Sequence, residues 1–189
     1  DLNFTATDSI VSRAKGEGLE FVAIYSPGSP VYAFNLTKPP FDDVRVRTAF
    51  VQAIDRDAMV ESAFGADALS ATGFTEEHWQ WHTPDSAIPE YDPDAAQALF
   101  DEVAAEQGGP VKITLTAFQQ SLDQARGEFI QTSLNQLDGI NVEVTVSDSP
   151  TNIQNVLAGN YMVSSWGFPA VAPDPGIYNS VHSQSLNNY

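Results

Sequence analysis

Two histidines, His78 and His82, form the densest group of potential metal ligands in this chain, and they follow directly after Glu76 and Glu77. Residues four apart lie on the same face of a helix, so His78, His82 and Glu77 could bind one ion together if this segment were helical. That arrangement would suit a metal-dependent enzyme or a metal-binding module.

The residues around these histidines favour a different role. A metalloprotease helix carries a Glu directly after its first His, whereas this chain has Trp79 there. Pro84 and the lack of any apolar period across residues 65–90 indicate a long loop instead of a helix. Histidines on the surface or in packing contacts are therefore the favoured alternative, and we predict no bound metal and no cofactor.

Other patterns that would indicate catalysis are absent from the sequence. It contains no Gly-x-Ser-x-Gly elbow, no phosphate-binding glycine loop and no dinucleotide fingerprint. Because there is no cysteine, thiolate catalysis and disulfides are excluded. Carboxylates are numerous, but no pair is marked out by its spacing as an acid and base pair. We therefore predict a protein that is not an enzyme.

The balance of charge limits the possible partners. The chain has 25 acidic and 8 basic side chains and a formal net charge of -17. Such a field repels nucleic acid and anionic membrane surfaces, so we expect no nucleic-acid partner. A hydrophobic content of 42% over 189 residues is enough to bury a globular core. No apolar run approaches the length that is needed to span a bilayer. We also expect the protein to be a monomer.

The run from Pro39 to Asp57 is the most informative stretch of the sequence. Two prolines end a strand predicted over residues 31–36, and Asp42 or Asp43 can cap the helix that follows. A second cap, Asp55, begins another short helix. One face of the first helix is apolar at helical spacing: Val46, Ala49, Phe50, Ala53 and Ile54.

The second half of the chain alternates between strands and helices. Asp92 followed by Pro93 marks the start of a helix that ends at Gly108. The periodicity then predicts strands over 111–116, 140–146 and 161–166, and helices over 122–137 and 153–158. This alternation is typical of an α/β fold with crossover connections.

The run from Pro39 to Asp57 resembles the family 5 extracellular solute-binding proteins, the peptide- and nickel-type receptors of ABC importers. The residues that carry the likeness are Asn35-Leu36-Thr37, the stretch 40–47 that begins Pro-Phe-Asp, and Ala53-Ile54-Asp55-Arg56. Further stretches match in the same order: 91–100, 111–115, 134–144, 159–167, 174–175 and 187–189. The resemblance therefore covers most of the chain.

This resemblance implies an α/β fold, the later lobe of a periplasmic-binding-protein-like receptor, with a mixed sheet and flanking helices. Residues 31–189 would form the solute-binding lobe, and residues 1–30 a lead-in from the neighbouring lobe or an edge of the same domain. Because family members are much longer, we expect a fragment of a receptor that binds a peptide-like or other small solute between two lobes. It also implies a membrane permease as partner and an extracellular, cell-surface or periplasmic location.

The resemblance also places the ligand-facing residues. It implies Trp166 as the first candidate and Phe168 and Asp174 as further ones, since one wall of the family's binding cleft comes from this strand and the loop after it. A Trp buried in the core at the end of a strand remains the alternative. Peptide-binding members place an acid three residues after the Trp, where this chain has Pro169. Capped peptides, sugars and metal chelates are therefore open alternatives to peptides with a free amine.

Overall fold

The computed structural model describes residues 13–14, 16–19, 30–64, 70–73, 83 and 87–167. The named strands are β1 Pro30–Phe34, β2 Val111–Phe118, β3 Ile140–Ser147 and β4 Val163–Gly167. The named helices are α2 Val44–Gln52, α3 Arg56–Phe64, α4 Pro93–Gln107, α5 Ser121–Leu134 and α6 Ser149–Leu157.

The four strands form one mixed sheet in the order β1-β4-β2-β3. Strand β2 runs parallel to both of its neighbours, while β1 is antiparallel to β4. The unit β2–α5–β3 is the crossover that parallel neighbours require, because a short turn cannot connect them. The α/β fold with a mixed sheet and flanking helices is thus confirmed.

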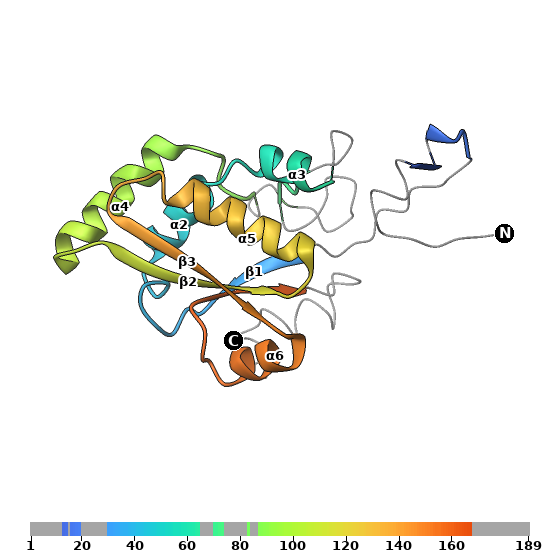
Figure 1. Ribbon diagram of the computed structural model, residues 1–189. Helices are drawn as coiled ribbons and strands as arrows, with labels where there is room; N and C mark the ends of the chain where they lie inside the picture. The colour runs from blue at the N-terminus through green and yellow to red at the C-terminus, as the bar shows by residue number, and fades with distance from the viewer. Residues whose placement is uncertain are drawn as a thin grey trace.

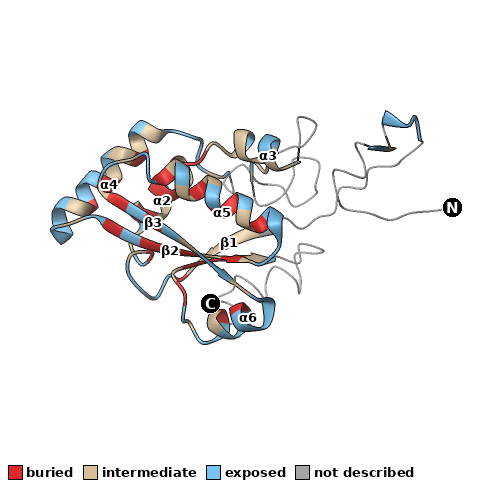
Figure 2. Cartoon of the chain, viewed as in Figure 1, coloured by how far each residue is buried: buried red, intermediate tan, exposed pale blue. Residues whose placement is uncertain are grey.

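The helices cover the two faces of the sheet unequally. Figure 1 shows α2, α4 and α5 on one side of the sheet and α6 on the other. Strand β2 follows this division, since Val111, Ile113, Leu115 and Ala117 are buried and the residues between them are exposed or half-buried. Side chains alternate between the faces of a strand, so the main core lies on the side of α2, α4 and α5 (Figure 2).

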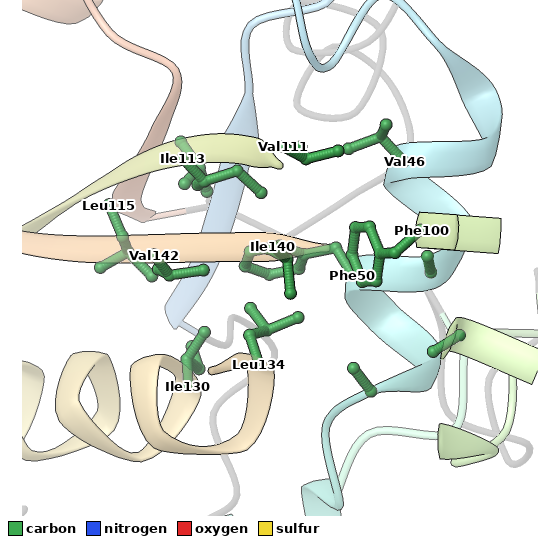
Figure 3. Packing of buried hydrophobic residues seen from close by; sticks show 14 of the residues in the cluster. Val46, Phe50, Phe100, Val111, Ile113, Leu115, Ile130, Leu134, Ile140 and Val142 are labelled. Atoms are coloured by element: carbon green, nitrogen blue, oxygen red, sulfur yellow. The ribbon is translucent and has the colours of Figure 1, made fainter. Parts of the chain in front are cut away.

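The core joins the signature helix α2 to this face of the sheet. Val46 and Phe50 of α2 meet Phe100 of α4 and the first residues of β2 and β3, Val111 and Ile140 (Figure 3). The Phe34 ring of β1 stacks on Phe41, with ring centroids 4.6 Å apart, and meets Phe50 edge-on at 5.2 Å. The apolar face predicted for α2 is confirmed, and its residues are buried: Val46, Ala49, Phe50, Ala53 and Ile54.

The buried amide of Asn35 locks the end of β1 to the turn before β4. Its Nδ2 donates to the carbonyls of Gly159 and Tyr161, at 3.1 and 3.0 Å. Its Oδ1 accepts from the backbone N–H and the hydroxyl of Thr37, at 3.1 and 2.7 Å. The Asn-x-Thr pattern therefore has a structural function here, because both residues satisfy polar groups that would otherwise be buried unpaired.

The predicted caps are largely confirmed. Asp43 is the residue that caps α2, and it accepts from the N–H of Arg45 at 2.8 Å. Asp55 accepts from the N–H of Ala58 at 3.0 Å, and Asp92 caps α4 directly before Pro93. Asp43 also belongs to a charged cluster in which Arg45 bonds to Glu106 of α4, tying the two helices together at the surface.

The prediction of one helix over residues 122–137 needs correction. Helix α5 ends at Leu134, three residues earlier, and Leu122 is exposed. The chain turns at Asn135, whose side chain exchanges hydrogen bonds with the backbone of Val142 and so ties the end of α5 to β3. The buried face of α5 instead includes two charged residues, Asp123 and Arg126, which an apolar period cannot reveal.

Other boundaries shift by a few residues. Helix α6 begins at Ser149, four residues before the predicted start, because Asp148 caps it by accepting from the N–H of Thr151. Strand β4 begins two residues later than predicted, at Val163. Almost all of the loop predicted over 65–90 lies outside the described residues. Among the residues described, no helix combines the length and apolar character of a membrane span.

Phe50→Ala should lower the free energy of unfolding by about 3–5 kcal/mol, since it removes a buried ring that touches two other rings. Urea unfolding of the chain measures this loss. Val44→Ala on the same helix is the control, because Val44 is exposed and should change little. A loss for Phe50→Ala as small as that of the control would contradict the assignment.

Asn35→Ala should cost about 1–3 kcal/mol, because it leaves the Gly159 and Tyr161 carbonyls without the amide that they accept from. The neighbouring change Leu36→Ala is the control, since Leu36 is half exposed. Thermal unfolding of the two variants provides the comparison. Equal unfolding midpoints would show that the Asn35 amide does not hold this turn.

Candidate functional site

Trp166 lies at the carboxyl end of β4, one residue before the strand stops. Strand β4 is an inner strand, paired with β1 on one side and β2 on the other, and Trp166 pairs across with Val31 of β1. The side chain is half-buried. By alternation, Trp166 shares its sheet face with Ser164, on the side where α6 lies.

The carboxyl end of this sheet has the topology of a ligand crevice. Helix α5 leaves the end of β2 on one face, and α6 leaves the end of the neighbouring strand β3 on the other face (Figure 1). In open α/β sheets, ligands bind outside the carboxyl ends of the strands where the connections separate in this way. Phe118, Ser147 and Gly167 end the three parallel strands at this edge.

Helix α6 is fastened to β4 directly beside Trp166. The fully buried Asn152 accepts from the Ser164 hydroxyl at 2.9 Å and donates to the Ser165 carbonyl at 3.2 Å. The backbone N–H and hydroxyl of Thr151 hold the pKa of Asp148 below its usual value, which keeps this helix cap charged. The two Asn152 bonds hold the β4 residues that directly precede Trp166.

On the opposite face, a buried carboxylate connects three elements at the same end of the sheet. Asp123, in the first turn of α5, accepts from the N–H of Phe118 at 2.6 Å and from the Ser165 hydroxyl at 2.8 Å. It also forms an ion pair with Arg126, one turn further along α5. Asp123 and Arg126 are only 3% and 8% exposed, so this is a buried salt bridge.

Two polar atoms beside this carboxylate have no hydrogen-bond partner among the described residues. They are Nε of Arg126 and the hydroxyl oxygen of Tyr32, both enclosed. Tyr32 stands directly opposite Ser165 in the β1–β4 register, so its side chain projects to the face that holds Asp123. Burial raises the pKa of Tyr32, as does the Asp123 charge, while Arg126 lowers it; the hydroxyl therefore keeps its proton.

Of the site residues predicted from the sequence, the structure describes Trp166 alone. Phe168 and Asp174 lie outside the described residues, as do His78, His82 and Glu77. The ligand-binding role of Trp166 is therefore still a prediction. Within the described ranges, no three His, Cys, Asp or Glu side chains come close enough together to hold a metal.

Sequence reasoning missed Tyr32, Asp123 and Arg126. The available signal was an acid and a base three residues apart, inside a helix that otherwise alternates apolar and polar residues. Such a pair usually lies on the solvent side, since charged residues are seldom fully buried. Only the packing of α5 on the sheet shows that both point inward.

A hollow of about 250 Å³ lies on the helical side of the molecule. It is bordered by Ala53 and Asp55 between α2 and α3, by Tyr91 and Pro93 at the start of α4, and by the last turn of α5. None of the residues that line it comes from the carboxyl ends of the parallel strands. It is thus separate from the Trp166 site.

Comparison with known families shows to which family the chain belongs. Residues 1–188 match the family described as "Bacterial extracellular solute-binding proteins, family 5 Middle". The chain belongs to this family. The resemblance read from Asn35 through Arg56 is confirmed, and the chain is assigned to extracellular solute-binding proteins.

Two curated relatives illustrate the sequence similarity. A glutathione-binding protein of Salmonella choleraesuis is 32% identical over 136 residues, which cover 72% of this chain and 26% of that protein. A dipeptide-binding protein of Escherichia coli is 22% identical over 165 residues, or 83% of this chain and 31% of that protein. Both relatives are binding proteins, and the chain spans less than a third of the length of either.

Solved structures show the same fold. A dipeptide-binding protein of a Pseudoalteromonas species, in complex with Met-Leu, superposes with a TM-score of 0.67 at 26% identity, covering 78% of this chain and 30% of that one. The OppA protein of Haemophilus influenzae, in complex with the peptide RPPGFSPFR, superposes with a TM-score of 0.73 at 22% identity, covering 96% of this chain and 37% of that one. The fold is therefore that of a periplasmic-binding-protein-like receptor.

Asp123→Asn should lower the free energy of unfolding by about 3–5 kcal/mol, because it keeps the shape but leaves the Arg126 charge buried and unpaired. Asp101→Asn is the matched control: it removes one exposed acid and should stay within about 0.5 kcal/mol of the parent chain. Chemical denaturation distinguishes the two. A destabilisation no larger than that of Asp101→Asn would show that the pair is not buried in solution.

Proposed function

We propose that this chain is the later lobe of the solute-binding component of an ABC import system. It has no reaction of its own and binds a peptide-like or other small solute against the carboxyl end of its sheet. A second lobe, contributed by the rest of a longer receptor, would close over the solute. Residues 31–189 would make up the lobe, with residues 1–30 leading in from the neighbouring one.

The observation that carries this proposal is the position of Trp166. It ends an inner strand at a topological switch point, in a chain whose family binds solutes. Its half-buried ring offers a large contact area with little conformational entropy to lose on binding. Helix α6 and Ser164 hold the strand beneath it, so the ring is placed before the solute arrives.

The class of solute follows from what the relatives bind and from Pro169. The relatives named above bind glutathione, dipeptides and longer peptides, so a peptide-like solute is the first expectation. Pro169 cannot supply the acid that pairs with a free amino terminus, so solutes whose amine is capped or absent suit this site better. Phe168 and Asp174 are further candidates for solute contact in the same loop.

The proposed partners are the solute and a membrane permease, and the proposed location is outside the cytoplasmic membrane. An excess of acidic side chains keeps such a receptor soluble and repels nucleic acid and anionic lipid alike. We propose a monomer that meets its permease transiently, with no cofactor.

The experiment that tests this function is native mass spectrometry of the full-length receptor that contains this chain. The proposal expects a small molecule that co-purifies with the receptor, is released on denaturation and rebinds when added back. A receptor that binds none of the small molecules supplied, including glutathione, Met-Leu and N-acetylated Met-Leu, while turning over a substrate, would contradict it.

Trp166→Ala in the full-length receptor should weaken binding of that solute by about 1–3 kcal/mol while sparing the fold, because the ring mainly stacks on the solute. Isothermal titration calorimetry measures the affinity, and circular dichroism checks the fold. Tyr91→Ala is the matched control, since it removes an exposed aromatic ring from the helical side. Unchanged affinity for Trp166→Ala would refute the assignment.

A further inference from the structure

The buried group around Asp123 contains more hydrogen-bond donors than acceptors. The Asp123 carboxylate accepts from Phe118, Ser165 and Arg126. The Arg126 Nε–H and the Tyr32 O–H are left without an acceptor among the residues that the structure describes. Each buried donor that lacks a partner costs stability, so a fold that keeps two of them in one buried group calls for an explanation.

Tyr32, Ser165, Asp123 and Arg126 contact or pair with one another in this order, and we call these four residues the series. Tyr32 pairs with Ser165 across β1 and β4, Ser165 donates to Asp123, and Asp123 bonds to Arg126. The electrostatic influence of Arg126 and Asp123 on the Tyr32 hydroxyl shows that all three groups share one environment. Two other enclosed atoms lack a partner among the described residues, Gln52 Oε1 at the end of α2 and Arg56 Nε at the start of α3. Both belong to half-buried side chains and have no such setting.

The location of the series links it to solute binding. Ser165 directly precedes Trp166, and Phe118 ends β2, so the series lies at the carboxyl end of the sheet. Trp166 projects to the α6 face and Ser165 to the α5 face, so the two lie on either side of the end of β4. A solute at this end would therefore meet Trp166 on one face of β4 and the donor group on the other.

The charges of Asp123 and Arg126 limit which chemical group of a solute could bind beside them. The Asp123 and Arg126 charges cancel, so an additional anion would leave a buried net charge, which is costly. A second cation would add a donor where acceptors are already lacking. An uncharged oxygen that accepts two hydrogen bonds satisfies both donors and adds no charge.

We propose that Arg126 Nε–H and Tyr32 O–H form a subsite for an uncharged oxygen acceptor of the solute, such as an amide carbonyl, which reaches these enclosed donors when the side chains around them move aside. The inference rests on the proposed function and adds the chemistry of one subsite. The solute oxygen would supply the acceptor that neither donor finds among the described residues. Tyr32 and Arg126 thereby act as specificity-determining residues.

Tyr32→Phe in the full-length receptor is the direct test, because it removes only the hydroxyl. Glutathione, Met-Leu and the co-purified solute are the probes, and calorimetry measures their affinities. The proposal expects Tyr32→Phe to weaken binding about tenfold, in keeping with the loss of one hydrogen bond. The ligand-free unfolding midpoint should stay the same or rise, because a donor without a partner has been removed.

Two further variants sharpen the comparison. Tyr91→Phe makes the same chemical change at an exposed position and should alter neither affinity nor midpoint. Arg126→Lys keeps the charge opposite Asp123 but removes the Nε–H, so it should also weaken binding. If Arg126→Lys fails to fold, Tyr32→Phe still decides the matter.

The possible outcomes separate the subsite from the function. Weakened binding with an unchanged or higher midpoint supports the subsite. Wild-type affinity in Tyr32→Phe overturns it while leaving solute binding intact, and would mean that an ordered water satisfies the donors. A lower midpoint in Tyr32→Phe also overturns it, since the hydroxyl would then have a structural partner. A wild-type receptor that binds none of the probes sinks the proposed function and the subsite with it.

Discussion

The Asp123 carboxylate is the interaction on which the candidate site depends most. It binds the last N–H of β2, the hydroxyl of Ser165 on β4 and the guanidinium of Arg126 on α5. These elements come from separate parts of the sequence and meet at one end of the sheet. A buried ion pair is weak evidence for added stability, but breaking one is costly, so it can define a single arrangement. Here it holds together the strand ends that flank the proposed crevice.

Two other buried polar side chains also hold strand β4 in place. Asn152 fixes α6 to the strand next to Trp166, and Asn35 fixes the end of β1 to the turn that leads into β4. Strand β4 is therefore held from both faces and at its beginning by amide or carboxylate side chains instead of by apolar packing alone. Directional bonds of this kind would preorganise the proposed binding wall, because the cost of ordering it is met before a solute arrives.

Much of the fold could be predicted from the sequence, because its determinants are local. The cap at Asp92 with Pro93 after it, and the alternation from Val111 onward, each specify an element within a few residues. The order of the strands and the burial of Asp123 and Arg126 could not be predicted in this way, since they depend on which elements pack together. Trp166 was found through family resemblance and the end of a strand, whereas Tyr32 carries no pattern that distinguishes it from an ordinary strand tyrosine.

The central claim is that solute binds at the carboxyl end of β2 and β4, between this lobe and the remainder of the receptor. The most direct measurement is a crystal structure of the full-length receptor with its co-purified solute. The account predicts solute atoms in van der Waals contact with the Trp166 ring, at the edge where β2 and β4 end. A solute bound elsewhere, for example in the hollow between α5 and the start of α4, with Trp166 packed away from it, would contradict the account.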